Sequence, residues 1–256
     1  MRRLARHCRT AAMILLSLAL FLAIWSLLSR FLFNPFLIPP PGKVLETAVP
    51  MALSGELGVN ILASISRVAV GFVSGSVVAI LVGLAMGRLR LVNELFDPII
   101  EFMRFLSPTA MIPIAVIWFG IGESSKYFLI FWGTVFIVLI NTIAGVMRTP
   151  LPRQNAALCF GASQLQIFRL IVLPSAVPYI VTGMRVALAS SYMSIIPAEL
   201  LAADRGLGYL LQSSSLMLQT DRIFVALITI SLVGFLSDRL FRLLVNTVGR
   251  RYVAVS

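Results

Sequence analysis

The stretch that decides the fold runs from Arg153 to Pro178 and reads RQNAALCFGASQLQIFRLIVLPSAVP. Long apolar runs lie on both sides of it, ending near Met147 and resuming near Tyr179. The stretch is too polar to lie in lipid and too regularly patterned to be a plain linker. It therefore predicts a structured loop on the membrane surface between two membrane-spanning helices.

Two short helices are predicted within this loop. Residues 155–160 form the first, which ends at Gly161 because glycine readily adopts the left-handed turn that closes a helix. Ser163 is a suitable N-cap for the second, and Pro174 and Pro178 are expected to stop it. An ordinary connector with some helical content is the alternative. Two helices around a glycine favour a docking element, because a partner protein needs a surface of constant shape.

The same stretch resembles the cytoplasmic coupling loop in permease subunits of binding-protein-dependent ABC importers. That loop carries Glu-Ala-Ala, then Gly four residues after the second Ala, then Ile-x-Leu-Pro ten residues beyond the Gly. The matching residues in this chain are Ala156, Ala157, Gly161, Ile171, Leu173 and Pro174. Asn155 stands where the family has Glu, which removes a carboxylate but keeps the positions that shape the loop. The resemblance implies that the loop binds a cytoplasmic ATPase subunit.

Flanking motifs are similar to the nitrate, sulfonate and taurine group of that family. They are Pro108, Ala110, Ile112-Pro113, Trp118-Phe119-Gly120, Thr182-Gly183-Met184-Arg185, Ala198-Glu199 and Gly206-Leu207-Gly208-Tyr209. The resemblance covers about residues 35–245. It implies the type I ABC importer permease fold in a bacterial inner membrane. It also implies a second permease copy, a solute-binding protein and a small anionic solute, such as nitrate, a sulfonate or taurine. The residues themselves give no reason to expect a cofactor or metal.

Composition independently indicates an integral membrane protein. Of the 256 residues, 59% are hydrophobic and 12% are charged, whereas a soluble domain is about 25% charged. Arginine supplies most of the net charge of +11. No basic cluster alternates with the stacking aromatic residues that are typical of nucleic-acid binding. We therefore interpret the positive charge as a signal of membrane topology.

The apolar runs predict an all-α protein with six transmembrane helices. The expected spans are residues 11–29, 61–86, 98–119, 127–147, 179–202 and 223–245. Residues 1–58 comprise a cytoplasmic tail, the first span and an external Pro-rich segment, residues 59–246 the transmembrane domain with its coupling loop at 153–178, and residues 247–256 a second tail. Six spans return the chain to the side on which it starts.

The distribution of basic residues predicts that both termini are cytoplasmic. Segments assigned to that side carry 13 of the 21 basic residues, namely Arg2, Arg3, Arg6, Arg9, Arg88, Arg90, Arg148, Arg153, Arg169, Arg239, Arg242, Arg250 and Arg251. The segments assigned to the outside carry Arg30, Lys43, Lys126, Arg205 and Arg222. Because Lys and Arg accumulate in cytoplasmic loops, this bias orients the whole bundle.

Small residues recur every fourth position in two of the spans. The second span has Gly71, Gly75, Ala79, Gly83 and Gly87, and the fifth has Ser190, Ser194, Ala198 and Ala202. A ridge of small residues lets a neighbouring helix approach closely, so both ridges predict helix packing. Glycine is also common in membrane helices for other reasons, which is the alternative.

Proline and ionisable residues mark candidate positions along a transport pathway. Pro108 and Pro113 interrupt the third span, which is tolerated where a helix lines a cavity or packs on protein. Four ionisable residues lie in or near membrane depth, where a charge costs about 2.5–3.5 kcal/mol at a helix centre. They are Arg67, Arg104, Arg185 and Glu199. They are expected to face a partner or a wet cavity, or to reach back toward the headgroups. For Arg67 and Glu199, which lie near the outer ends of their spans, extension toward the headgroups is favoured.

The absence of certain motifs distinguishes an ABC permease from an enzyme, a secondary transporter and a non-transporting scaffold. The chain has no G-x-x-x-x-G-K-[ST] phosphate loop and no Ser/His/Asp set or metal-ligand spacing, so an enzyme is not expected. A secondary transporter remains an alternative, but it predicts mid-membrane carboxylates and inverted repeats, which the sequence does not show. A non-transporting scaffold is a second alternative. It would need neither a broken third span nor a capped loop.

Overall fold

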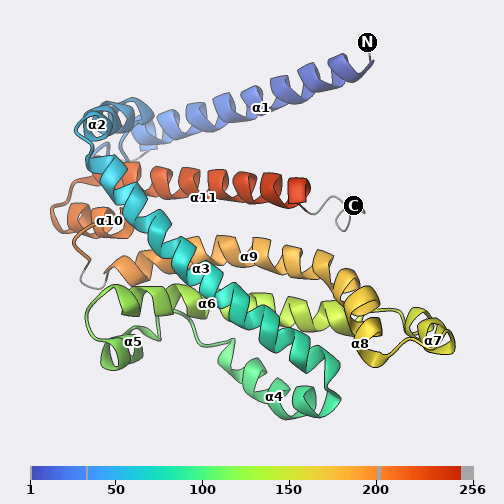
Figure 1. The fold of residues 1–256 in the computed structure, drawn as a ribbon. Helices are drawn as coiled ribbons and strands as arrows, with labels where there is room; N and C mark the ends of the chain where they lie inside the picture. The colour runs from blue at the N-terminus through green and yellow to red at the C-terminus, as the bar shows by residue number, and fades with distance from the viewer. Residues whose placement is uncertain (1, 33, 201–202, 249–256) are drawn as a thin grey trace.

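The computed structural model describes residues 2–32, 34–200 and 203–248, which are helical apart from short turns and contain no β-strand. Figure 1 shows their arrangement. The helices in chain order are α1 (Arg2–Leu27), η1 (Leu28–Leu32), α2 (Pro41–Leu53), α3 (Glu56–Arg88), α4 (Arg90–Met103), α5 (Ile112–Phe119), α6 (Glu123–Met147), α7 (Leu151–Cys159), α8 (Gln164–Ile167), η2 (Phe168–Val172), α9 (Leu173–Leu200), α10 (Leu207–Leu216) and α11 (Thr220–Val248). The predicted all-α class is confirmed for these residues.

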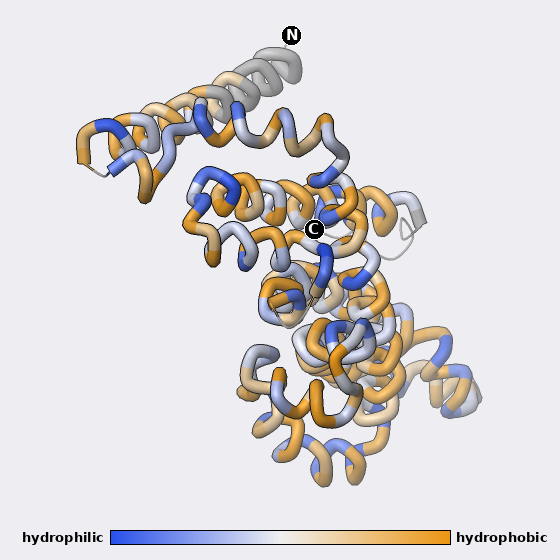
Figure 2. Tube along the Cα trace, turned by 90° about the vertical axis from the view of Figure 1, so that its left-hand side faces the viewer, coloured by the Kyte–Doolittle hydropathy of each residue, from blue (hydrophilic) through white to orange (hydrophobic). Residues whose placement is uncertain are grey.

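Four helical runs among the described residues are long and apolar enough to cross a membrane. They are Glu56–Arg88, Glu123–Met147, Gln164–Leu200 and Thr220–Thr247. The first predicted span lies within α1 and η1, and the third corresponds to α4 and α5 together. Figure 2 shows hydrophobic residues along the helices and hydrophilic ones mainly at their turns and ends.

The core of the bundle is a row of three helices, in which α6 lies between α3 and α9. Small residues of α3 face α6 along its length. A Cβ built on Gly71, Gly83 or Gly87 would lie 2.6, 2.8 or 2.6 Å from a Cβ of α6. Their partners are Ile130, Thr142 and Val146 in that order, while Gly75 meets Thr134 and Ala79 is fully buried. The constant register along both helices means that α3 and α6 run parallel.

Close contacts also join α6 to α9, which run antiparallel. A Cβ on Gly183 would lie 2.5 Å from the Cβ of Asn141, and one on Gly145 would lie 2.8 Å from the Cβ of Tyr179. At the other end of α9, the Ser190 hydroxyl donates to the Gly133 carbonyl at 3.0 Å. Ser194 also packs on Gly133 and Ala198 is fully buried, whereas Ala202 lies outside the described residues.

The third predicted span is interrupted, and it consists of two separate helices. Helix α4 ends at Met103, and α5 begins at Ile112 with Pro113 in its first turn, where the missing amide costs no helical hydrogen bond. The intervening segment needs other partners for its carbonyls. The Trp132 indole on α6 supplies one by donating to the Leu106 carbonyl at 3.0 Å.

The prediction that Pro174 and Pro178 stop the second loop helix is wrong. Helix α8 continues through the π-helical turn η2 into α9, so the loop helix and the fifth span form one rod. The Leu173 amide bonds to the Phe168 carbonyl, five residues back. The helix changes here from the π-helical to the α-helical hydrogen-bond pattern. Pro174 lies at this change, where the loss of one backbone amide disturbs the fewest hydrogen bonds. Pro178 removes one further bond without ending the helix.

The two ends of the bundle differ in structure. One end, at the right of Figure 1, carries α7 and α8 together with the N-terminal end of α1 and the C-terminal end of α11. We call it the α7–α8 end. The opposite end carries α2 and α10, whose buried Met51 and Leu210 form a common apolar cluster with Val225 and Ala226 of α11. We call it the α2–α10 end.

Candidate functional site

The predicted coupling loop forms a compact projection at the α7–α8 end. Helix α7 ends as expected: Gly161 has φ +79°, and the Gly161 amide bonds to the Leu158 carbonyl at 2.9 Å. The Ala162 amide bonds to the Ala157 carbonyl at 3.0 Å, which completes the usual glycine-closed helix end. The Ser163 hydroxyl then caps α8, and Gln166 reaches back to the Ser163 amide. This capping box satisfies backbone donors that are otherwise unpaired.

The residues of the family motif divide into a packed set and an exposed set. Ala157 and Ile171 pack against a buried cluster that includes Val146 of α6 and Ile167 of α8. Leu173 and Pro174 are half-buried in the first turn of α9. Asn155, Ala156 and Gly161 are exposed. The packed residues hold the loop against the bundle, and the exposed ones face outward.

A further contact attaches the loop to the end of α3. The Arg88 guanidinium lies 5.0 Å from the centre of the Phe168 ring and donates to the Gln164 carbonyl at 3.3 Å. A cation over an aromatic face contributes about 0.5–1 kcal/mol at an exposed site. The arginine therefore links α3 to α8 and η2, and sequence inspection had assigned it only a topological role.

The outward surface of this loop is unusually apolar for a polar segment. Phe160 is 92% exposed and Leu165 is 56% exposed. Phe160 directly precedes Gly161, Leu165 lies in α8, and Leu158 on α7 is also exposed. Rigid backbone with exposed apolar side chains is typical of a protein-binding surface.

Arg104 and Pro108 line a hollow of about 460 Å³ beside α6 and α9. Arg104 forms an ion pair with Glu101 at 2.8 Å and leaves its side chain 37% exposed. Trp132, Gly133 and Ser190 form the far wall. Pro113 does not line this hollow, because it begins α5 instead. The hollow is therefore lined by one guanidinium and two serine hydroxyls, those of Ser107 and Ser190.

Arg185 lies elsewhere, at a second hollow of about 650 Å³ between α9 and α11. Its guanidinium contacts Asp238 of α11 at 2.8 Å, and Arg242 contacts the other oxygen of the same carboxylate. Asp238 was not singled out from the sequence. The structure thus separates Arg104 from Arg185 rather than bringing them into one charged site.

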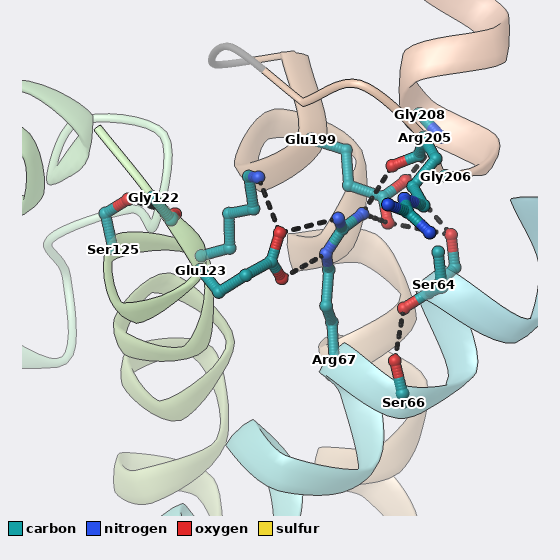
Figure 3. Close-up of polar contacts among 12 residues, drawn as sticks. Ser64, Ser66, Arg67, Gly122, Glu123, Ser125, Glu199, Arg205, Gly206 and Gly208 are labelled. Atoms are coloured by element: carbon teal, nitrogen blue, oxygen red, sulfur yellow. Dashed lines mark hydrogen bonds and ion pairs between the residues drawn. The ribbon is translucent and has the colours of Figure 1, made fainter.

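The expectation that Arg67 and Glu199 extend toward headgroups is wrong. Both side chains are buried, and the Arg67 Nη1 atom lies 2.8 Å from the Glu199 Oε1 atom. Figure 3 shows Arg67 between two carboxylates, with Glu123 of α6 on its other side at 2.7 Å. Lys126 completes the group at 2.9 Å from Glu123. Pairing inside the protein removes the cost that would otherwise drive these charges outward.

The same group holds the start of α10. The Glu199 carboxylate accepts a hydrogen bond from the Gly208 amide at 2.7 Å, and the Ser64 hydroxyl accepts one from the Leu207 amide at 2.8 Å. Ser64 in turn donates to Glu199 at 2.8 Å, and Asn60 accepts from the Gly206 amide at 2.7 Å. Ser64, Asn60 and Glu123 were missed at the sequence level. Asn60 and Ser64 are one turn apart on α3, and Glu123 begins α6. None of the three belongs to a recognisable sequence motif.

Comparison with known proteins finds relatives over most of this chain. The family model described as binding-protein-dependent transport system inner membrane component matches residues 75–250. The taurine transport system permease protein TauC of Escherichia coli strain K12 is 36% identical over 228 residues, covering 87% of this chain and 83% of TauC. The nitrate import permease protein NrtB of a Synechocystis species is 32% identical over 241 residues, covering 91% and 87% respectively.

A solved structure supports the fold separately. A chain of the inward-facing MetNI methionine ABC transporter superposes with a TM-score of 0.60 at 19% sequence identity. The superposition covers 75% of this chain and 97% of that chain. At this identity the likeness concerns the fold alone.

Proposed function

Since this chain belongs to the family of binding-protein-dependent transport system inner membrane components and is an ABC importer permease subunit, we propose that it carries a small oxyanion. Its relatives named above are permeases for taurine and for nitrate. Taurine carries a sulfonate group, so both named solutes present negatively charged oxygens. The proposed cargo is therefore nitrate, taurine or another sulfonate.

The main support for coupling to an ATPase is the capped, outward-facing loop at the α7–α8 end. Asn155, Ala156 and Gly161 are the residues we propose to contact a cytoplasmic ATPase subunit. The exposed Phe160 ring supplies the apolar area that such an interface buries. Because Asn155 has no charge, the contact made by the family carboxylate is replaced here by neutral hydrogen bonding.

ATP hydrolysis is assigned to that separate subunit. The chain contains no G-x-x-x-x-G-K-[ST] cradle, and its two lysines, Lys43 and Lys126, follow no glycine-rich loop. In the described residues Lys126 is already paired with Glu123. The separate subunit hydrolyses ATP, and the permease changes conformation in response. An external solute-binding protein delivers the cargo.

The hollow beside Arg104 is the proposed part of the pathway. Its guanidinium presents a positive field to a passing oxyanion, and the Ser190 hydroxyl lies on the opposite wall. A weak site is sufficient, since the delivery protein supplies specificity in such systems. Arg185 and Glu199 are proposed to act as structural charges, because each is paired with a charge on another helix.

A second copy of this chain is proposed to complete the pathway. Helix α4 has no buried residue and exposes Leu91, Leu95 and Phe102. Its only substantial helix contact within the described residues is with α3. Such a face needs lipid or protein, and its position next to the Arg104 hollow favours a partner permease.

The proposed orientation places the α7–α8 end in the cytoplasm. Both the start of α1 and the end of α11 lie at that end of the bundle, as Figure 1 shows. Arg2, Arg3, Arg6 and Arg9 are at the start of α1, and Arg239 and Arg242 are in the C-terminal part of α11. The positive-inside rule then makes the α2–α10 end external.

Reconstitution with the ATPase encoded by a neighbouring gene tests these assignments. The two proteins should co-purify, and uptake of radiolabelled nitrate or taurine into liposomes should require ATP. Gly161→Pro should insert normally but uncouple hydrolysis from uptake, because proline cannot adopt φ +79°. Uptake that is driven by an ion gradient and abolished by an ionophore would instead favour a secondary transporter. A complex that hydrolyses ATP without transport would favour a scaffold.

A further inference from the structure

We propose that the Arg67–Glu199 ion pair connects the α8–η2–α9 rod to helix α10, so that movement of the coupling loop is passed to the external end of the protein. The inference rests on the proposed function, because it assumes that an ATPase moves the α7–α8 end. It concerns residues outside both the coupling loop and the Arg104 hollow. Arg67 and Glu199 are positioning residues in this proposal and do not touch the cargo.

The first step is the continuity of the rod. Residues Gln164 to Leu200 form one helical run of 37 residues. At about 1.5 Å per residue the run is about 55 Å long, which is enough to cross the whole bundle. Its first turn is capped by Ser163 inside the coupling loop, and its last turn carries Glu199. A displacement of the loop therefore has a direct mechanical route to Glu199.

The second step is the attachment at the far end. Arg67 donates to the Arg205 carbonyl at 2.6 Å, and Glu199 accepts from the Gly208 amide at 2.7 Å. Gly206 and Leu207 lie between these two residues. Their backbone amides donate to the Asn60 and Ser64 side chains of α3. These amides belong to the first turn of α10, where backbone donors have no helical partner. The segment before α10 is thus held by consecutive hydrogen bonds, as Figure 3 shows for the labelled residues.

The third step is the close approach that two glycines permit. A Cβ on Gly206, whose φ is +131°, would overlap the Glu199 carboxylate. A Cβ on Gly208 would lie 2.9 Å from the Glu199 Cβ. No other residue type leaves the carboxylate this close to the backbone. The two glycines therefore allow Glu199 to pack against the start of α10. This close packing accounts for a glycine on each side of Leu207.

The two carboxylates on Arg67 are not equivalent. The Glu199 side chain is completely buried, whereas the Glu123 side chain is 47% exposed. Water can replace Arg67 at Glu123 but not at Glu199, where an unpaired charge would remain in the core. Helix α6 can thus separate from Arg67 during a conformational change, while α9 and α10 stay joined. This asymmetry is what a transmitting connection requires.

Helix α10 then carries the movement to the surface of the α2–α10 end. Its buried Leu210 packs with Val44 and Met51 of α2 and with Val225 of α11. A shift of the first turn of α10 therefore displaces the external layer that an arriving solute-binding protein meets.

Two cysteine reporters in the assembled permease–ATPase complex test the proposal. The native Cys159 on α7 is exposed and reports on the coupling loop, and Ser215→Cys on α10 reports on the external layer. The complex is placed in lipid nanodiscs, with Cys8→Ser throughout and Cys159→Ser where α10 is labelled. Labelling rates with a maleimide are compared before and after trapping with ATP and vanadate.

Trapping should change both labelling rates in the unmodified complex. In Glu199→Gln the change at Cys159 should persist and the change at Ser215→Cys should be lost. Asn60→Ala removes the hydrogen bond to the Gly206 amide, together with a bond from Asn60 to the Glu56 carbonyl within α3. It should reduce the change at Ser215→Cys and serves if Glu199→Gln fails to assemble. Glu56→Gln is the matched control, because it breaks the ion pair with Arg222 at the same end and should leave both changes intact.

The outcomes separate the inference from the proposed function. A Cys159 rate that ignores nucleotide in the unmodified complex would contradict the proposed coupling loop, and the inference with it. A responsive Cys159, combined with an α10 label that responds equally in the unmodified complex, Glu199→Gln and Asn60→Ala, would overturn the inference alone. An α10 label that never responds to trapping would do the same.

Discussion

Gly83 on α3 packs so closely against Thr142 on α6 that a Cβ on residue 83 would lie 2.8 Å from the Thr142 Cβ. The Thr142 hydroxyl is engaged with the Val138 carbonyl at 2.7 Å, so its side chain cannot turn away without losing that bond. The contact sets the distance between the two helices at the centre of the bundle. Larger side chains on this ridge must therefore separate α3 from α6.

Gly83→Val should destabilise the permease by about 1–3 kcal/mol, the usual cost of overpacking a tight core. The midpoint of thermal unfolding, measured by fluorescence-detected gel filtration in detergent, should fall. Gly58→Ala on the same helix is the control, because nothing lies within 4 Å of a Cβ there. Equal unfolding midpoints for the two variants would show that the ridge does not set the helix spacing.

Substitutions at Gly161 should act through backbone conformation alone. The residue has φ +79° and open space around a Cβ, so size is irrelevant there. Gly161→Val should weaken binding of the ATPase and lower uptake, because a β-branched residue pays about 1–2 kcal/mol or more in the left-handed region. Gly161→Asn, which tolerates that region, should retain most coupling. Binding is measured by co-purification, and equal losses in both variants would point to a different cause.

Arg104→Gln should reduce oxyanion uptake without reducing assembly with the ATPase. The substitution removes the positive charge from the hollow and leaves its walls unchanged. Arg90→Gln is the matched control, since its ion pair with Glu94 is solvent-exposed and lies on α4, the helix that ends directly before Arg104. Initial rates of uptake into liposomes provide the measurement. Normal uptake by Arg104→Gln would remove this hollow from the pathway.

Substituting Arg67 alone should lower the stability of the permease more than substituting Arg67 and Glu199 together. Arg67→Met leaves the buried Glu199 carboxylate unpaired, which costs about 3–5 kcal/mol. Adding Glu199→Gln neutralises that carboxylate, so the double variant should recover part of the lost stability. Thermal unfolding of the single and double variants forms the comparison. A double variant that is less stable than Arg67→Met would argue against a buried ion pair.

The two ends of the bundle should react with membrane-impermeant reagents from opposite sides. Cys159 should be labelled in inverted membrane vesicles and protected in intact cells, because α7 is assigned to the cytoplasm. Ser215→Cys, combined with Cys159→Ser and Cys8→Ser, should show the reverse pattern once an outer membrane is permeabilised. Labelling of Cys159 from outside the cell would invert the proposed orientation and end the coupling assignment.

Helix identity and loop chemistry could be predicted because they depend on neighbours along the chain. The apolar runs place α3, α6, α9 and α11, and a serine at position 163 predicts the helix cap that the structure has there. The glycine ridge on α3 is also visible at a spacing of four. Pro174 misled the prediction, because the π turn that accommodates it is not encoded by any local motif.

Composition, hydropathy and short-range spacing by themselves determined that this is a helical membrane protein with a structured surface loop, and the resemblance of that loop to a known family indicated a permease. Each of those features follows from the chemistry of residues within one or two helical turns. The tertiary structure alone decided that Arg67 meets Glu199, 132 residues away, and that Arg185 meets Asp238, 53 residues away. Such pairs depend on how each helix is rotated and how far it slides against its neighbours, and only the packing of the whole bundle sets those two quantities.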